Sequence, residues 1–276
     1  MKISTKLGIG AFLAAAVIGG GAAVALYVSP ENSTGQIEPV AAHGPLPDNA
    51  ALTVVELFTS QSCSSCPPAE AFLAELVEQH DNVLGLEFHV TYWDNLVAGS
   101  QGRWKDIFSD PSHTQRQRVY NERLRGRPAV FTPQMVIGGA VQAVGTRRDE
   151  VLGAISMVAR GDRKPVALEV DWIPAGGLAV SVWDFDANGP TGDIWLVTYE
   201  PARATFIPRG ENAGRTLQNH NIVHDLRHLG RWSGGDVTVV EVGEYSLSAD
   251  QRCAVLLQGP QQGPIYAAAR CPDAPI

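Results

Sequence analysis

The stretch VVELFTSQSCSSCPPAE, residues 54–70, constrains the fold more than any other part of the chain. Its first residues are β-branched and apolar, a pattern that predicts a buried strand. Two cysteines separated by two residues follow, and after them come Pro67 and Pro68. Proline is tolerated in the first turn of a helix, because its missing N–H would have no partner there in any case. The sequence therefore predicts a strand, a CxxC loop and an amphipathic helix in that order.

Cys63 and Cys66 in this loop fit more than one kind of site. The unpaired N–H groups and the dipole at the start of the helix would stabilise a thiolate and lower the pKa of Cys63. Cys66 lies one turn further on, within disulfide reach, and would be the buried resolving thiol. This placement favours reversible thiol–disulfide exchange. A static disulfide and half of a zinc site are the alternatives, although a structural zinc site needs further nitrogen or sulfur ligands and the sequence holds no second CxxC.

Residues 51–161 are expected to form a mixed α/β unit. After the first helix come a second buried strand, a helical insert at residues 95–127, a hairpin that turns at a Gly-Gly pair, and a final helix. Within the insert, Trp104 and Phe108 lie on one face of a first predicted helix. Pro111 is expected to break that helix, and a second helix follows it.

Residues 164–276 are expected to form a second, smaller domain. Strand-like segments separated by Gly, Pro and Asn recur there at short intervals, which is typical of an all-β, sandwich-like domain. The boundary is expected in the segment GDRKP, residues 161–165. Cys253 and Cys271 flank a segment that would turn near Gln261, so we expect a structural disulfide between them. A relay of electrons to the first cysteine pair is the alternative.

The N-terminus carries a targeting signal. Lys2 and Lys6 precede an apolar run, residues 7–28. The run contains no charged residue and is long enough to span a bilayer. A removed export signal, residues 1–28, and a retained inner-membrane anchor both fit, and residues 29–50 are expected to be a linker. In either case the rest of the chain is expected to be periplasmic or secreted, where disulfides persist.

The net charge of the chain disfavours some classes of binding partner. A formal net charge of −8 argues against nucleic acid as a partner. Contact with a membrane is expected only through the N-terminal apolar run. No Ser-His-Asp order, HExxH motif or paired carboxylates occur at the spacing that hydrolases use, so hydrolysis is disfavoured. No cofactor and no resident metal are expected.

Thr132 and Pro133 open a strand that otherwise reads as central to the sheet. Proline is normally excluded from central strands, because it cannot donate a backbone hydrogen bond. A cis peptide bond before Pro133 would explain its presence, since cis X–Pro bonds occur at tight turns. An edge strand that begins with proline is the alternative.

The layout of a CxxC after the first strand, a Thr-Pro before a hairpin and a final helix resembles the thioredoxin fold. The resemblance implies that Cys63 is the attacking thiol, that Cys66 is the resolving thiol, and that the loop with Thr132 and Pro133 docks the substrate chain. Protein thiols or disulfides would then be the partners. The insert is similar in placement to the helical insert of periplasmic disulfide oxidoreductases.

A narrower resemblance rests on several segments together. ELFTSQSCSSCPPAE, YWD, TQRQ, FTPQMVIGG and RGENAGRTL resemble the exported thioredoxin-like proteins of domain-of-unknown-function family 1223. The likeness covers nearly the whole chain after the linker. It implies a family and no activity, because the family's name assigns none.

Three further residues are candidates for the site. In thioredoxin, the acidic residue that assists proton transfer lies six residues before the first cysteine. Glu56 lies seven before Cys63, which would turn its side chain to the other face of the strand. Glu56 is thus a hypothetical proton acceptor, with a hydrogen-bonded strand carboxylate as the equal alternative. Trp93 and Asp94 end the second strand, where they would form a rim around Cys63 or simply a packed Trp and a turn.

The sequence favours an exported thiol–disulfide oxidoreductase. One alternative is a periplasmic protein that handles copper with the CxxC thiols and a histidine such as His89. The other is a non-catalytic binding module in which the first cysteine pair is a structural disulfide. The segment RGENAGR, residues 209–215, has neither phosphate-loop nor dinucleotide-turn spacing and is interpreted as a structural loop.

Overall fold

The structure of the protein is a computed structural model. It describes residues 51–95, 104–161, 166–174, 176–184, 189–235 and 237–273. The N-terminal apolar run, the linker, part of the insert and most of the GDRKP boundary lie outside the described residues. Among the helices that are described, none is long and apolar enough to cross a membrane.

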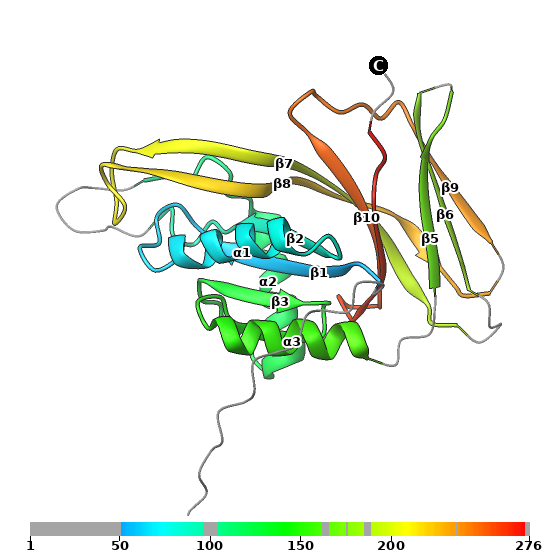
Figure 1. Cartoon of the computed structure of the whole chain (residues 1–276), viewed down its shortest axis with the longest axis horizontal. Coiled ribbons are helices and arrows are strands. Elements are labelled where there is room, and N and C mark those ends of the chain that lie inside the picture. The colour runs from blue at the N-terminus through cyan, green and yellow to red at the C-terminus, as the bar shows by residue number, and fades with distance from the viewer. Residues whose placement is uncertain are drawn as a thin grey trace, which may run out of the picture. The chain divides into compact units, whose positions relative to one another are not determined.

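The first part of the chain is a mixed α/β unit. In order, its elements are β1 (Thr53–Thr59), α1 (Pro67–Gln79), β2 (Val83–His89), α2 (Pro111–Arg125), β3 (Gln134–Ile137), β4 (Val141–Val144) and α3 (Arg148–Arg160) (Figure 1). β1 is parallel to β2 and antiparallel to β3, which pairs with β4 in a hairpin. The strand order is therefore β2-β1-β3-β4, and outside the insert the elements follow one another as the sequence predicts.

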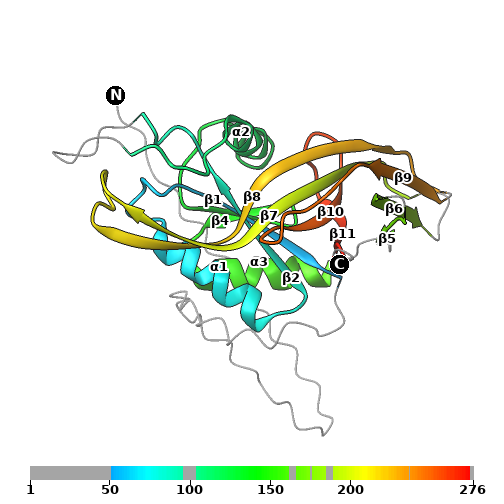
Figure 2. The ribbon, with the colours of Figure 1, turned by 90° about the horizontal axis from the view of Figure 1, so that it is seen from above.

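β1 is buried on both faces, and its side chains alternate between two cores. Val55 and Leu57 pack with α1 and α3 in one core. Val54 and Phe58 lie in the other core, which also contains Tyr120 of α2. Figure 2 accordingly shows α2 on the opposite side of the sheet from α1 and α3. Burial on both faces explains why the strand reads as a continuous apolar run in the sequence.

The insert holds one described helix rather than two. The first helix predicted around Trp104 and Phe108 is wrong over the described residues 104–110, because they hold a turn at residues 107–108 and no helix. The Asp106 carboxylate accepts a hydrogen bond from the Phe108 backbone N–H at 2.9 Å. Such a local bond competes with helical hydrogen bonding. α2 then begins where Asp110 caps the N–H of Ser112 at 2.7 Å.

The remaining strands are β5 (Val166–Trp172), β6 (Gly177–Asp184), β7 (Gly192–Ile207), β8 (Arg215–Trp232), β9 (Thr238–Gly243), β10 (Arg252–Gln258) and β11 (Ile265–Arg270). Four of them extend the first sheet, which has eight strands in the order β11-β10-β7-β8-β2-β1-β3-β4. β8 joins β2 where Ile222 lies beside Glu87. This differs from the expected separate domain, because the contact between two edge strands leaves no periodic signal in the sequence.

A smaller sheet covers one side of the β-rich part. It has three strands in the order β5-β6-β9. Val180 of β6 shares a core with Leu196 of β7 and Val255 of β10. Two sheets packed over a common core are the sandwich-like arrangement that the sequence predicts, although one of those sheets continues into the α/β part.

Cys253 and Cys271 form the expected disulfide. The bond joins the second residue of β10 to the residue after β11. Between the strands, Gln261 and Gln262 adopt positive φ angles of 56° and 53°, so the chain reverses where the sequence predicts a turn. A disulfide that closes a short loop stabilises a fold mainly by restricting the unfolded chain.

We expect replacement of both Cys253 and Cys271 by Ala to lower the free energy of unfolding by about 3 kcal/mol, as the entropy of a loop of this length predicts. Alanine avoids adding a polar group at Cys253, which is buried. Urea unfolding followed by tryptophan fluorescence measures the loss. A change below about 1 kcal/mol would contradict the stapling role.

Candidate functional site

Cys63 and Cys66 form a disulfide in the loop between β1 and α1, with a Cα–Cα distance of 5.5 Å. Cys66 caps α1, and its carbonyl accepts hydrogen bonds from the N–H groups of Ala69 and Glu70. The helix therefore starts at the second cysteine, as the two prolines predict. Both cysteines are fully buried, at 0% exposure, whereas the two serines between them are exposed.

The loop before β3 touches the first cysteine. The Thr132–Pro133 peptide bond is cis, which confirms the prediction. The Thr132 hydroxyl donates to the Cys63 Sγ at 3.3 Å, and the Ser65 hydroxyl lies 3.3 Å from the same sulfur. Two hydroxyl groups thus face Cys63, where each can donate a hydrogen bond to a thiolate.

Trp93 is tied to this loop. Its indole Nε1 donates to Thr132 Oγ1 at 2.7 Å, which leaves the Thr132 hydroxyl proton free to point at Cys63. β2 ends at His89, so Trp93 and Asp94 lie in the following turn and not at the end of the strand itself. The structure therefore brings Trp93, Thr132 and Cys63 together.

Asp94 forms hydrogen bonds with residues of the insert and not with the cysteines. Its carboxylate accepts from the Ser109 hydroxyl at 2.6 Å and from the Asp106 N–H at 3.1 Å. Partial burial raises the pKa of Asp94, and the Ser109 hydrogen bond opposes that rise. Asp94 therefore holds Asp106, whose carboxylate accepts from the Gln61 N–H of the CxxC loop. Asp94 acts on this loop through Asp106 and has no contact of its own with the sulfurs among the hydrogen bonds of the described residues.

Glu56 lies in a different network. Its carboxylate accepts from Arg116 Nε at 2.7 Å and from the Tyr120 hydroxyl. Arg116 also donates to Gln258 of β10 at 2.9 Å, so the pair links β1, α2 and β10 in the buried core. The structure does not bring Glu56 to the cysteines, which agrees with its position seven residues before Cys63.

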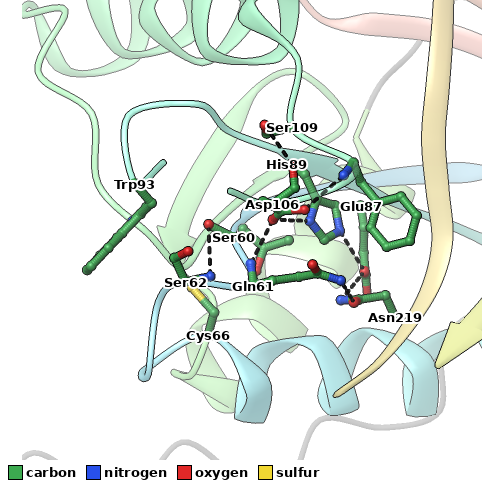
Figure 3. A network of polar contacts seen from close by, with 12 residues as sticks. Ser60, Gln61, Ser62, Cys66, Glu87, His89, Trp93, Asp106, Ser109 and Asn219 are labelled. Carbon is green, nitrogen blue, oxygen red and sulfur yellow. Dashed lines mark hydrogen bonds and ion pairs between the residues drawn. The ribbon is translucent and has the colours of Figure 1, made fainter. Parts of the chain in front are cut away.

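A buried polar network lies behind the CxxC loop (Figure 3). The Gln61 N–H donates to Asp106 Oδ2 at 2.7 Å, and the same oxygen lies 2.7 Å from His89 Nδ1. His89 Nε2 lies 3.4 Å from Glu87, which accepts from Asn219 at 3.0 Å. Burial lowers the pKa of His89, but Asp106 and Glu87 outweigh it and raise that pKa to about 10. His89 is therefore an imidazolium that neutralises part of the carboxylate charge.

This network argues against His89 as a copper ligand. Both ring nitrogens of His89 are bonded to carboxylates, so the residue would have to break buried ion pairs before it could bind a metal. Within the described residues, no group of three or more His, Cys, Asp or Glu side chains is arranged to hold a metal ion.

Glu70 is a buried carboxyl that the sequence does not single out. It lies in the first turn of α1, and the Thr59 hydroxyl donates to its Oε1 at 2.6 Å. Burial, together with the charge of Glu87, raises the pKa of Glu70 to about 8. A carboxyl four residues after the second cysteine is a visible sequence feature, but its burial depends on the packing of α1 against β1 and β8.

The raised pKa makes stability depend on pH. The unfolded chain ionises Glu70 near pH 4.5, whereas the folded protein holds it protonated up to about pH 8. The stability from this group is therefore complete below pH 4.5 and is lost as the pH rises toward 8. We expect Glu70→Gln, which mimics the protonated form, to gain more than about 1 kcal/mol over the wild type between about pH 5 and about pH 8.

Urea unfolding at those two pH values checks this result. Glu78→Gln is the matched control, because Glu78 lies on the same helix and is exposed. Equal pH profiles for Glu70→Gln and the wild type would show that Glu70 ionises normally in the folded protein.

The segment interpreted as a structural loop, RGENAGR, also reaches the site. Asn212 Nδ2 donates to the carbonyls of Gln61 and Cys63 at 2.9 and 3.0 Å. The Ser64 N–H donates to Glu211 Oε2 at 2.9 Å. These contacts join residues 147 to 151 positions apart, so no local pattern in the sequence could reveal them.

The chain matches the model of a family described as "Protein of unknown function (DUF1223)" over residues 54–258. It is similar to the crystal structure of protein AGR_C_4864 from Agrobacterium tumefaciens, with a TM-score of 0.66, 25% identity, and coverage of 82% of this chain and 97% of the other. HBP35 of Porphyromonas gingivalis is similar in fold alone, with a TM-score of 0.53, 14% identity, and coverage of 85% and 80%. No curated protein matches the chain.

Proposed function

The chain belongs to the DUF1223 family, whose description assigns no activity, and we propose that it is an exported thiol–disulfide oxidoreductase. Cys63 is the attacking thiol and Cys66 the resolving thiol. The observation that carries the proposal is the Cys63–Cys66 disulfide at the start of α1, with the Thr132 hydroxyl donating to the Cys63 sulfur at 3.3 Å.

The reaction proceeds in two exchanges. In the reduced protein, the Cys63 thiolate attacks one sulfur of a partner disulfide, which forms a mixed disulfide and releases one partner thiolate. The Cys66 thiolate then attacks the Cys63 sulfur, releases the second partner thiolate and closes the Cys63–Cys66 bond. The partner has gained two electrons and the pair has lost two, and the released thiolates take protons from water. The reverse sequence delivers a disulfide.

The surroundings of Cys63 suit this chemistry. The Thr132 and Ser65 hydroxyls can donate to a thiolate, and the start of α1 adds a favourable dipole. Hydrogen bonds to the charged form of a group stabilise that form, so the reduced pair would hold its charge on Cys63.

The arrangement of the elements supports a thioredoxin-like fold with α2 in its helical insert. The order β2-β1-β3-β4, with the CxxC after β1 and a cis-proline before β3, is the layout on which the resemblance rests. In that fold the Thr132–Pro133 loop docks an extended partner chain. Protein thiols or disulfides are therefore the proposed substrates.

Two disulfides support an oxidising compartment. The apolar residues 7–28 support export, with either removal of the segment or its retention as an inner-membrane anchor. Periplasmic or secreted placement is the proposal that joins both observations.

A second candidate is a binding module in which the Cys63–Cys66 bond is structural. The complete burial of both cysteines favours it, because a partner cannot reach a buried sulfur without movement of the surrounding chain. The two candidates differ in the reduction potential of the pair.

That potential is the test of the proposal. The full-length protein is equilibrated in glutathione and dithiothreitol redox buffers, its thiols are alkylated, and the peptide carrying Cys63 and Cys66 is quantified by mass spectrometry. A reversible couple between roughly −270 and −120 mV, the span of exchange proteins, is expected. A potential below about −300 mV would mark a structural bond and overturn the proposed activity.

A further inference from the structure

The tip of the β7–β8 hairpin, residues 208–214, lies against the CxxC loop. β7 and β8 pair along most of their length, from Gly192 beside Trp232 to Ile207 beside Arg215. Figures 1 and 2 show this hairpin extending along α1 toward the β1–α1 loop. The tip therefore contributes to the environment of the cysteine pair although it belongs to the β-rich part of the chain.

Asn212 anchors the tip. Its Nδ2 donates to the carbonyls of Gln61 and Cys63, and its Oδ1 accepts from Arg215 Nη1 at 2.7 Å. The residue is fully buried, and both of its side-chain polar atoms are hydrogen-bonded. Such a satisfied, buried amide holds two segments in one register.

The anchored tip places a carboxylate on the backbone N–H of the residue that follows the attacking cysteine. Glu211 Oε2 accepts from the Ser64 N–H at 2.9 Å, and Ser64 follows Cys63 directly in the chain. N–H groups before a helix provide positive potential that a thiolate can use. The Ser64 N–H is already hydrogen-bonded to the Glu211 carboxylate, so it is not available to stabilise a thiolate.

The other acidic groups near the loop, Asp106 and Glu70, carry no uncompensated charge. Asp106, which accepts from the Gln61 N–H, is paired with His89. Glu70 keeps its proton at neutral pH, because burial raises its pKa to about 8. No ion pair among the described residues includes Glu211. No ion pair within the described chain therefore neutralises its charge, although Glu211 is exposed and solvent screens part of that charge.

We propose that Glu211 is a positioning residue for thiol–disulfide exchange, whose carboxylate, placed by Asn212, disfavours the Cys63 thiolate and so stabilises the disulfide form of the pair. The inference rests on the proposed function and deepens it, because the hairpin tip would then set the reduction potential of the Cys63–Cys66 pair. Two negative charges near one another repel, and the reduced pair carries such a charge on Cys63, the residue directly before Ser64.

Glu211→Gln tests the inference, because it keeps the acceptor for Ser64 and removes only the charge. We expect the thiol–disulfide equilibrium constant of the pair to move about three- to tenfold toward the dithiol, which is about 15–30 mV at 29.6 mV per tenfold change. The pKa of the Cys63 thiol is expected to fall in the same variant, as read from thiolate absorbance after reduction with dithiothreitol.

Two controls separate the charge from the structure. Glu169→Gln makes the same charge change on exposed Glu169 of β5 and should leave the equilibrium constant unchanged. High salt should shrink the Glu211→Gln effect, since the screening length falls from about 10 Å at 0.1 M to about 3 Å at 1 M. In an Asn212→Ala background the effect should shrink as well, because the carboxylate is no longer held in place.

Equal equilibrium constants and Cys63 pKa values for Glu211→Gln and Glu169→Gln would overturn the inference, and so would an effect that does not respond to salt. A wild-type pair that no redox buffer reduces reversibly would instead overturn the proposed function. In that case the Cys63 thiol pKa of the chemically reduced protein still decides whether Glu211 acts as inferred.

Discussion

Cys66→Ser is expected to accumulate as a mixed disulfide with partner proteins when it is produced in the compartment where the wild type resides. The Cys63 thiolate can still attack a partner disulfide, but no second thiol is present three residues away to release the product. Release then requires an external thiol. Non-reducing electrophoresis of the variant, trapped with acid and alkylated, should show bands of higher mass that disappear on reduction.

Cys63→Ser is the matched control for this experiment. It removes the same number of thiols from the same loop, but it leaves only Cys66, to which the structure assigns neither the Thr132 nor the Ser65 hydroxyl. We expect few or no mixed disulfides from Cys63→Ser and loss of exchange activity in both variants. Equal trapping by the two variants would show that Cys63 is not the preferred nucleophile.

Arg116→Met is expected to lower the free energy of unfolding by about 3–5 kcal/mol, because it leaves a buried carboxylate without its cation. Arg116 Nε lies 2.7 Å from Glu56 Oε1, and both side chains are almost completely buried. Methionine fills much of the volume of the arginine stem, so the loss reports the charge more than a cavity. Chemical denaturation at neutral pH measures it.

The double variant Arg116→Met with Glu56→Gln is the control for that prediction. It removes both charges and keeps an acceptor for the Tyr120 hydroxyl. We expect it to recover most of the stability that the single variant loses, since a buried pair replaced on both sides costs far less than a pair broken on one side. A double variant as unstable as Arg116→Met would mean that packing rather than charge dominates at this position.

Local patterns predicted much of the α/β part. The apolar run of β1, the prolines at the start of α1 and the proline before β3 each fix a local backbone state, and neighbouring residues suffice to read them. The disulfide between Cys253 and Cys271 followed from a hairpin with cysteines at both ends. The first predicted helix of the insert failed because the Asp106 side chain bonds to the backbone locally and to His89 at a distance.

The sequence by itself determined the position of the cysteine pair and the start of the helix behind it, because these depend on residues close together in the chain. The contact between the Thr132 hydroxyl and Cys63 joins residues 69 positions apart, so the tertiary structure decided it. Only the tertiary structure decided that β8 joins β2, that Glu56 pairs with Arg116, and that Glu211 and Asn212 reach the CxxC loop. Contacts between distant segments depend on which surfaces remain unpaired after local structure forms. The hydrophobic periodicity of one segment does not identify the distant segment that it will contact.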